Sequence, residues 1–377
     1  MKLLFISTMA SSSWGGSEEL WVKSANYATK QGHQVIASVY NWQPLHPKLI
    51  ELKNNGAEIH FRRKIYYGTS TYSRIKGFII KKLFSQKDIE TLITSKPDAI
   101  IISQGTVYEC MYPEFIKLSN ATNAKVFIIT QANSEYDTLP HHCFEIGREL
   151  FKKASHLFFV SNRNLLVAER QLAIKLSNAS VISNPANLNS YNICEWNTSD
   201  TIHMAFVGRL NSTVKGLGVL FQILSDEKWI HRDWCLNLYG KGDDEDYLKK
   251  LTAFYNLNDR INFKGFVNDV NSIWRENHIL LMPSTLEGTP LTLIEAMLCG
   301  RTAVVSDVGG NAELIIDAEN GFVAEAPSVF SFGNAMERMW NKKRELTVFS
   351  ENARKRILDI IDTNPECTLI KKIEEFI

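Results

Sequence analysis

Residues 284–300 read STLEGTPLTLIEAMLCG, and their pattern predicts a loop that leads into a mostly buried helix. Pro290 suits the first helical position, where its missing N–H would be unpaired anyway, and Thr289 suits the N-cap. From Leu291 to Leu298 apolar side chains cover most of the helix surface, as is typical of a helix buried on most sides. Gly300 fits the position at which such a helix stops.

Two carboxylates interrupt this apolar stretch, Glu287 in the loop and Glu295 in the helix. Burying a carboxylate without a partner costs several kcal/mol or shifts its pKa. One interpretation of Glu295 is a core residue paired with a buried arginine or a backbone N–H. The other is that it binds a polar ligand, and the same choice arises for Glu287. The stretch alone leaves both interpretations open.

The composition limits the classes of protein to which the chain can belong. Its 377 residues are too many for one ordinary core and favour two domains. A formal net charge of +1 gives no indication of nucleic-acid binding. The six cysteines lie far apart without a C-x-x-C pair, so we expect reduced thiols and neither zinc nor a disulfide framework. No apolar run approaches the roughly 18 residues of a membrane-spanning helix, and the first residues read as a strand.

The order of apolar runs predicts two doubly wound α/β domains. Continuous β-branched and aromatic runs are typical of parallel strands covered on both faces, and helical stretches separate them. The alternation breaks near Asn184 in a stretch rich in Asn and Ser, and then restarts. We therefore expect Rossmann-like domains at residues 1–185 and 186–362 that face a central cleft, with a last helix at 363–377 packing back on the first domain. The expected strands are KLLFIST, HQVIASVY, AEIHF, DAIIIS, KVFIIT and HLFFVS in the first domain, and IHMAFVG, CLNLYG, INFKGF, HILLMPS, TAVVSDVGG and GFVAE in the second.

The loop after the first strand contains the pair Gly15–Gly16 directly before a helix, with Ser17 as its expected N-cap. A glycine-rich turn at a helix N-terminus exposes N–H groups that suit an anion, although a simple tight turn explains it equally well. The loop is not G-x-G-x-x-G and no Walker lysine follows, which disfavours dinucleotide and P-loop functions.

Two further loops in the second domain could hold phosphate. Arg209 and Lys215 lie between a strand and a helix, and together could clamp a diphosphate, although loop cations are often only solvated. Gly288 and the unpaired N–H groups of Leu291 and Thr292 lie at a helix N-terminus, where an anion is stabilised.

These motifs, taken in order, resemble a known family. VGRL…KG, GFV, PSTLEGTPLTLIEAMLCG and GGNAELI…NGFV are similar in order and spacing to the retaining glycosyltransferases of family four, which have the GT-B fold. The similarity covers roughly residues 206–323, and GGSEELWVKSANYATKQGHQV resembles more loosely the opening of their acceptor domain.

The resemblance implies a role for each motif. Glu295 would bind the ribose of a sugar nucleotide and Glu287 would face the transferred sugar. Arg209 and Lys215 would hold the diphosphate and neutralise the leaving group. No metal or other cofactor is expected, because cationic side chains and helix dipoles do that work in this family. The remaining donor-binding residues implied are Gly15, Gly16, Phe266, Val267, Gly288, Thr289, Pro290 and Leu291.

One departure from the family concerns a histidine after the fifth strand, where this chain reads IITQANSEYD. Gln131 and Asn133 can donate hydrogen bonds but cannot act as an acid or base near neutral pH. We therefore count both among the catalytic candidates, with the hypothesis that one of them hydrogen-bonds to the sugar.

A basic segment from Arg62 to Lys87 carries eight cations and no acid, with aromatic residues interleaved. It reads either as a solvated helix face or as a dock for anionic lipid head groups or a phosphorylated, lipid-linked acceptor. The basic residues are Arg62, Arg63, Lys64, Arg74, Lys76, Lys81, Lys82 and Lys87.

From the motifs and the resemblance we expect a retaining hexosyltransferase. It would move a sugar from a nucleoside diphosphate donor, taken as a UDP-sugar, to a glycan or glycolipid in cell-surface polysaccharide biosynthesis. We expect it in the cytoplasm, peripheral to the inner face of the membrane. The alternatives are a sugar-nucleotide-binding subunit of low activity that partners another glycosyltransferase, and a phosphorylase or epimerase on the same fold.

Overall fold

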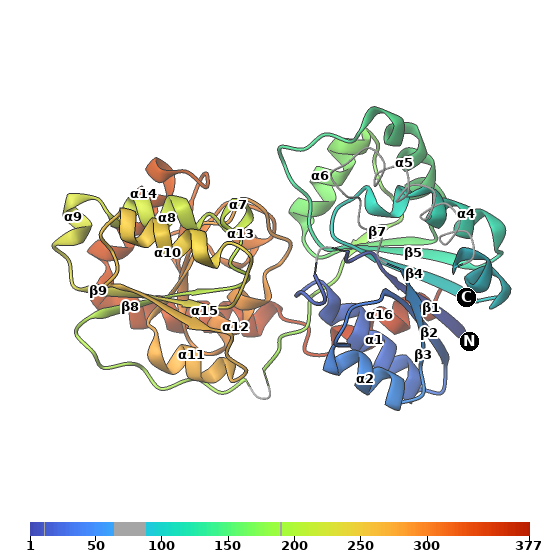
Figure 1. The fold of residues 1–377 in the computed structure, drawn as a ribbon, viewed down its shortest axis with the longest axis horizontal. Helices are drawn as coiled ribbons and strands as arrows, with labels where there is room; N and C mark the ends of the chain where they lie inside the picture. Colours follow the sequence, from blue (N-terminus) through green and yellow to red (C-terminus); the bar gives the residue numbers. More distant parts are fainter. Residues whose placement is uncertain (11, 64–87, 189–190) are drawn as a thin grey trace. The chain divides into compact units, whose positions relative to one another are not determined.

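The computed structural model describes residues 1–10, 12–188 without 64–87, and 191–377. The chain divides into two compact units (Figure 1). Unit 1 comprises Met1–Pro185 together with Asp362–Ile377, and unit 2 comprises Ala186–Ile361.

Unit 1 contains a parallel sheet with the strand order β3-β2-β1-β4-β5-β6-β7. The chain places β2 and β3 on one side of β1 and the later strands on the other, so the order reverses between β1 and β4. Its strands are β1 (Lys2–Ser7), β2 (Gln34–Tyr40), β3 (Glu58–Arg62), β4 (Ala99–Gln104), β5 (Lys125–Thr130), β6 (His156–Phe159) and β7 (Ala179–Val181). Its helices include α1 (Glu18–Lys30), α2 (Pro47–Asn54), η1 (Glu109–Met111), α4 (Pro113–Ala121), α5 (His141–Lys153), α6 (Asn162–Leu172) and α16 (Pro365–Glu374).

Strand β1 shows why its four central residues, Leu3 to Ile6, are all apolar. Leu3 and Phe5 belong to one buried cluster with residues of α1, α2 and α16. Leu4 and Ile6 belong to a second cluster with residues of α4, α5 and α6. Alternate side chains of a strand point to opposite faces, so a strand covered by helices on both sides needs apolar residues at every position.

Unit 2 repeats this architecture with the parallel order β10-β9-β8-β11-β12-β13. Its strands are β8 (Ile202–Val207), β9 (Trp234–Tyr239), β10 (Ile261–Gly265), β11 (Ile279–Met282), β12 (Thr302–Ser306) and β13 (Phe322–Ala324). Its helices are α7 (Ser212–Lys215), α8 (Leu217–Leu224), α9 (Glu227–Ile230), α10 (Glu245–Phe254), α11 (Val270–Glu276), α12 (Leu291–Leu298), α13 (Asn311–Leu314), α14 (Val329–Asn341), η2 (Lys343–Glu345) and α15 (Leu346–Ile360).

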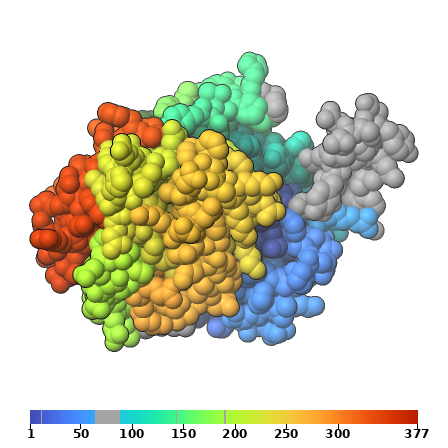
Figure 2. Space-filling view, turned by 60° about the vertical axis from the view of Figure 1, so that its left-hand side comes forward, coloured from blue at the N-terminus to red at the C-terminus, as the bar shows by residue number. Residues whose placement is uncertain are grey.

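The two faces of the unit 2 sheet again carry separate cores. Met204 and Phe206 of β8 pack with residues of α8, α10 and α14. Ala205, between them in sequence, packs on the other face with residues of α11, α12 and α15. In the space-filling view the yellow and orange segments of unit 2 form one continuous surface (Figure 2).

The expected α/β architecture with two doubly wound sheets is confirmed. Every expected strand is present, and the sheet of unit 1 also contains the short β7, which the sequence pattern did not reveal. Helix α16, at the end of the chain, packs on α1 and lies in unit 1. Its Leu369 and Ile373 are fully buried there.

Two details differ from expectation. Helix α12 begins at Leu291, with Pro290 rather than Thr289 in the N-cap position. Pro290 has the extended backbone of a cap (ψ 124°), so it ends the loop instead of starting the helix. The second difference concerns Arg62, which was expected on an exposed basic surface.

The side chain of Arg62 is only 6% exposed, and its guanidinium lies 4.4 Å from the centre of the Tyr40 ring. It also donates a hydrogen bond to the carbonyl of Ser7. Arg62 therefore belongs to the interior of unit 1 and not to a basic surface, whereas Arg63 is exposed. The rest of the basic segment, residues 64–87, lies outside the described residues.

Among the described residues, no helix has both the length and the apolar character needed to cross a membrane.

Candidate active site at the carboxyl edge of the unit 2 sheet

The strand order of unit 2 defines where a ligand should bind. Strand β8 lies between β9 and β11, so the connections that leave β8 and β11 run to opposite sides of the sheet. Ligands of open α/β sheets bind at such a switch point, outside the carboxyl ends of the strands. The two connections are residues 208–216 after β8 and residues 283–290 after β11.

These two connections are joined by backbone contacts. Thr285 donates its N–H to the carbonyl of Val214 over 2.9 Å. Gly216 has φ +65°, and a Cβ there would lie 2.0 Å from the carbonyl oxygen of Pro283. Only glycine accepts both the left-handed backbone and this close approach. Gly216, directly after Lys215, thus allows the two loops to come this close.

Lys215 and Glu287 meet at this junction. Lys215 Nζ lies 2.6 Å from Glu287 Oε1, with side chains 23% and 8% exposed. The pair joins the last residue of α7 to the loop before α12, across 72 positions of sequence. A carboxylate this buried needs a partner, and Lys215 supplies it. The ammonium is more exposed than the carboxylate, so it can contact a ligand while it keeps Glu287 neutralised.

A glycine turn after β12 packs against the backbone of Glu287. Gly309 has φ +52°, and a Cβ there would lie 2.2 Å from the carbonyl oxygen of Glu287. Gly310 donates its N–H to the carbonyl of Gly288 over 2.6 Å. The VGGN sequence after β12 therefore packs against the loop that carries the Glu287 carboxylate and holds it in place. The sequence showed this glycine pair, but its role as a support became visible only in three dimensions.

The loop then enters the N-terminus of α12 through Gly288, Thr289 and Pro290. The N–H groups of Leu291 and Thr292 have no acceptor among the described residues. They lie at the positive end of the helix dipole, which stabilises an anion. Arg209, on the connection after β8, is exposed. The carboxyl edge of unit 2 thus gathers two cations and a helix N-terminus.

Glu295 is 5% exposed, in the second turn of α12. Its Oε1 accepts a hydrogen bond from the N–H of Asn187 over 3.1 Å. This is the pairing with a backbone N–H that the sequence left open. Glu295 therefore fastens the segment after Ala186 to α12, and any contact with a ligand would come in addition.

The predicted base-binding residues lie in the β10–α11 connection of the same edge. Phe266 is 68% exposed, whereas Val267 packs against the core beneath it. Gly240 donates its N–H to the carbonyl of Gly265 over 2.8 Å, which ties this connection to the end of β9. An exposed aromatic ring on an anchored turn is available for stacking.

Four predicted residues belong to unit 1, at the carboxyl edge of its own sheet. Gly15 and Gly16 precede α1, and their carbonyls accept the N–H groups of Glu18 and Glu19 over 3.0 and 3.3 Å. Ser17 is the N-cap residue, as expected, but its side chain makes no capping hydrogen bond. The turn thus satisfies the first N–H groups of α1 itself.

Asn133 and Gln131, the other two, differ in their surroundings. Asn133 Oδ1 accepts from the N–H of Val107 over 3.1 Å, and its Nδ2 donates to the carbonyl of Asn164 over 2.9 Å. Gln131 is 5% exposed, and its Nε2 has no hydrogen-bond partner among the described residues. Asn133 is thus occupied in holding α6, which leaves Gln131 as the better candidate for a ligand contact.

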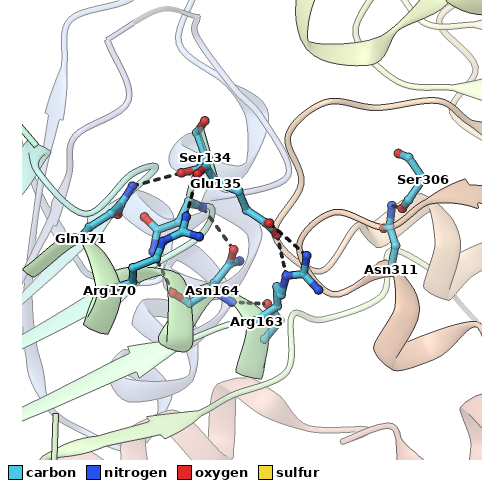
Figure 3. Close-up of polar contacts among 10 residues, drawn as sticks. Ser134, Glu135, Arg163, Asn164, Arg170, Gln171, Ser306 and Asn311 are labelled. Atoms are coloured by element: carbon cyan, nitrogen blue, oxygen red, sulfur yellow. Dashed lines mark hydrogen bonds and ion pairs between the residues drawn. The ribbon is translucent and has the colours of Figure 1, made fainter. Parts of the chain in front are cut away.

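Around Asn164, several polar contacts fasten the loop after β5 to α6 (Figure 3). Arg163 and Glu135 point toward each other and form a two-pronged ion pair, with Nη2 3.0 Å from Oε2. Arg170 and Gln171 donate to the carbonyls of Glu135 and Ser134 over 2.6 and 3.0 Å. Sequence reasoning missed this network because its members are far apart in the chain.

In unit 2 the same figure shows Asn311, whose Nδ2 donates to the carbonyl of Ser306 over 2.9 Å. Its Oδ1 has no partner among the described residues, and neither has the hydroxyl of Ser284. Both residues are fully buried, Ser284 just after β11 and Asn311 at the start of α13, beside the loops of the candidate site. No sequence motif identifies them individually.

Residues 196–356, which lie within unit 2, match the family model described as "Glycosyl transferases group 1". The match includes Lys215, Glu287, Glu295 and the loops around them. The match is therefore confined to unit 2.

Comparison with whole proteins extends the similarity to unit 1. The chain is 25% identical over 368 residues to an uncharacterised glycosyltransferase of Haemophilus influenzae, covering 94% of this chain and 95% of that protein. It is 34% identical over 104 residues to an Escherichia coli UDP-Gal:alpha-D-GlcNAc-diphosphoundecaprenol alpha-1,3-galactosyltransferase, covering 28% of this chain and 27% of that protein.

The structure of Anabaena Alr3699/HepE in complex with UDP-glucose superposes with a TM-score of 0.74 at 16% identity, covering 100% of both chains. At this identity the likeness shows the fold, which is GT-B. Fold and sequence matches together support a glycosyltransferase of the GT-B fold.

Proposed function

We propose that the protein is a retaining glycosyltransferase that uses a nucleoside diphosphate sugar, with UDP as the nucleotide, and a glycan or lipid-linked acceptor. The observation that carries the proposal is the Lys215–Glu287 pair of 2.6 Å at the switch point of unit 2. A buried carboxylate, a partly exposed ammonium and the N-terminus of α12 together form a site for a ligand with both hydroxyls and phosphates.

The chemistry assigns each group a task. As the glycosidic bond breaks, the leaving diphosphate gains negative charge and the anomeric carbon becomes oxocarbenium-like. Lys215 and Arg209 would stabilise the diphosphate, and would matter most in the transition state, where the charge is largest. Glu287, held between Lys215 and the 309–310 turn, would accept hydrogen bonds from the transferred sugar. We propose retention through attack on the face from which the diphosphate departs, with a phosphate oxygen as the base.

The remaining donor contacts follow from the layout of the same edge. Glu295 would bind the ribose, and the exposed ring of Phe266, with Val267, would lie against the base. From unit 1 we propose the Gly15–Gly16 turn against the phosphates and Gln131 against the sugar. The reaction would need no metal, because cationic side chains and helix N–H groups supply the positive charge.

The names of the relatives support a surface polysaccharide or glycolipid as the destination of the sugar. The Escherichia coli relative acts, by its name, on GlcNAc-diphosphoundecaprenol, which is a lipid-linked acceptor. We propose an acceptor of this kind, and a cytoplasmic enzyme that works at the inner face of a membrane.

Measuring nucleotide release tests the proposal. The purified protein is incubated with UDP-glucose, UDP-galactose, UDP-N-acetylglucosamine and the GDP-sugars, with and without EDTA, and free nucleotide is quantified. Release with one donor that persists in EDTA supports the proposal, and retention is read from the anomeric NMR signal of the product. Thermal stabilisation by a nucleotide without any turnover would instead support the sugar-nucleotide-binding subunit.

Two carboxamide variants separate the carboxylates. Glu295→Gln should weaken binding of UDP itself, whereas Glu287→Gln should leave UDP binding nearly unchanged and reduce transfer. Titration calorimetry with UDP and the release assay measure the two effects. The reverse pattern would overturn the assignment of both residues.

A further inference from the structure

Two of the six free cysteines lie side by side in unit 2, although they are far apart in the sequence. The N–H of Cys194 donates to the carbonyl of Cys299 over 3.0 Å. Their sulfur atoms lie 3.7 and 3.4 Å from the same atom, Oδ1 of Asn271. The two thiols also share a hydrogen bond, so their sulfur atoms face each other, as a disulfide requires.

Buried Arg301 holds the two segments in this arrangement. Its Nη1 donates to the carbonyls of Cys194 and Cys299, both over 3.3 Å, and its Nε donates to the carbonyl of Asn277 over 2.8 Å. Gly300 allows the close approach, since a Cβ there would lie 2.8 Å from Ile193 Cγ1. The thiols are thus set by backbone contacts that do not depend on the sulfur atoms.

The two thiols have unequal acidity. The hydrogen bond from Cys299 and the charge of Arg301 lower the pKa of Cys194 to about 7, against the opposing effect of burial. The same contact with Cys194, together with burial, raises the pKa of Cys299. Near neutral pH, a substantial fraction of Cys194 is therefore thiolate, which is the nucleophilic form, whereas Cys299 keeps its proton.

We propose that Cys194 and Cys299 form a site of reversible oxidation, in which a peroxide converts the two thiols into a disulfide. In the first step the Cys194 thiolate attacks a peroxide oxygen, which gives a sulfenic acid and hydroxide from hydrogen peroxide. In the second step the sulfur of Cys299 attacks Cys194 Sγ, and the sulfenic oxygen leaves as water with the proton of the Cys299 thiol. The two thiols lose two electrons, and the peroxide is reduced to two waters.

The disulfide would join the segment that enters unit 2 to the end of α12. Cys299 is the C-cap of α12, the helix that carries Glu295. Cys194 lies on the segment that Glu295 holds at Asn187. Oxidation would therefore fasten this segment at a second point, covalently, and close a loop from 194 to 299. Such a loop restricts the unfolded chain, so the oxidised protein should unfold at a higher temperature than the reduced one.

Peptide mapping after mild oxidation tests the proposal. The reduced protein is treated with hydrogen peroxide at pH 7.5, blocked with N-ethylmaleimide and digested without reductant. A linked peptide pair containing Cys194 and Cys299 should accumulate before any other cysteine is lost, and dithiothreitol should reverse it. In Cys299→Ala, dimedone should trap the sulfenic acid at Cys194. Cys235→Ser, in the same unit, serves as the matched control and should form the same linked pair.

Two outcomes contradict the proposal. One is that wild-type protein keeps Cys194 alkylatable under conditions in which Cys143 or Cys367 oxidises. The other is a disulfide that excludes either Cys194 or Cys299. Both are read from the wild-type chain, so the test does not depend on the stability of the variants or on the proposed transferase activity.

Discussion

The polar side chains at the carboxyl edges of the two sheets differ in whether they remain exposed to a ligand. In unit 2, Lys215 and Glu287 form an ion pair whose ammonium remains 23% exposed. In unit 1, the side chain of Asn133 is engaged at both polar ends by Val107 and Asn164. The first arrangement leaves a charge within reach of a ligand, whereas the second uses its hydrogen-bonding capacity to hold the fold.

The contrast extends to the charged residues of unit 1. Glu18 accepts hydrogen bonds from Ser7 over 2.7 Å and from Trp21 over 3.0 Å, and it is 5% exposed. Arg62 donates to the carbonyl of the same Ser7. Unit 1 therefore buries a carboxyl group and a guanidinium that contact the same residue of β1, whereas unit 2 presents a partly exposed cation. At the carboxyl edge of two sheets of the same type, polar side chains can thus either stabilise the fold or remain available to a ligand.

The largest effect should come from Lys215→Ala. If Lys215 stabilises the leaving diphosphate as proposed, its loss should lower kcat/KM for transfer about 100- to 1,000-fold, or roughly 3 to 4 kcal/mol. Nucleotide release measures it. Lys249→Ala removes an exposed lysine of α10 that pairs with Glu245 and should leave the rate unchanged. A rate within threefold of wild type for Lys215→Ala would place the cationic function elsewhere.

The next effect concerns the closing helix of unit 1. Leu369 is fully buried in α16 against α1, so Leu369→Ala should reduce the free energy of unfolding by about 3 kcal/mol. Urea unfolding measures it. Lys371→Ala, an exposed position of the same helix, should stay within about 0.5 kcal/mol of wild type. Equal stabilities of the two variants would mean that α16 contributes little to unit 1.

Asn133→Ala tests directly whether this edge of unit 1 is structural. Removing the amide leaves the N–H of Val107 and the carbonyl of Asn164 without their partner, which should cost about 2 kcal/mol of stability. Thermal unfolding measures it. Gln131→Ala removes an Nε2 that has no partner among the described residues. Compared with Asn133→Ala, it should therefore lower the stability less and reduce the transfer activity more. Unchanged turnover in Gln131→Ala would remove that residue from the site.

The smallest effect is a pH dependence due to Glu18. Burial raises the pKa of Glu18 from 4.5 to about 7, against its hydrogen bonds to Ser7 and Trp21 and the charge of Arg62, while Glu109 raises it further. Because the folded pKa lies above the unfolded one, the folded state binds the proton more tightly. This carboxyl therefore destabilises the protein progressively as the pH rises through that window.

Glu18→Gln keeps an oxygen for Ser7 and Trp21 but does not titrate. The variant should gain about 1 to 2 kcal/mol relative to wild type between pH 5 and pH 8. Urea unfolding at both pH values measures the gain. A constant difference between variant and wild type would show that Glu18 does not change its ionisation in this range.

Much of the fold could be predicted because each strand is covered on both faces. A run such as KLLFIS can be recognised from its own sequence, since its four central residues are all apolar. Strand β7 escaped detection because its three residues, Ala179–Val181, are all only half-buried. The start of α12 was misplaced by one position because Pro290 can either cap a helix or begin it.

For the candidate site, local motifs identified single residues but not their pairing. Glu287 and Lys215 stand in separate loops, and only the close approach of Gly216 to Pro283 shows that the loops meet. The occupied amide of Asn133 and the burial of Arg62 depend on Asn164 and Tyr40, which are distant in sequence. Such contacts leave no periodicity or spacing that could be read from one chain.

The path of the chain also bears on the order in which the protein folds as it is synthesised. Unit 2, Ala186–Ile361, is one continuous segment, whereas unit 1 is made of two pieces that flank it. Three buried residues of α16, Leu369, Ile370 and Ile373, complete the core of unit 1. A ribosome synthesises these residues after the whole of unit 2. Unit 2 can therefore finish folding before unit 1, whose core is complete only when α16 has been made.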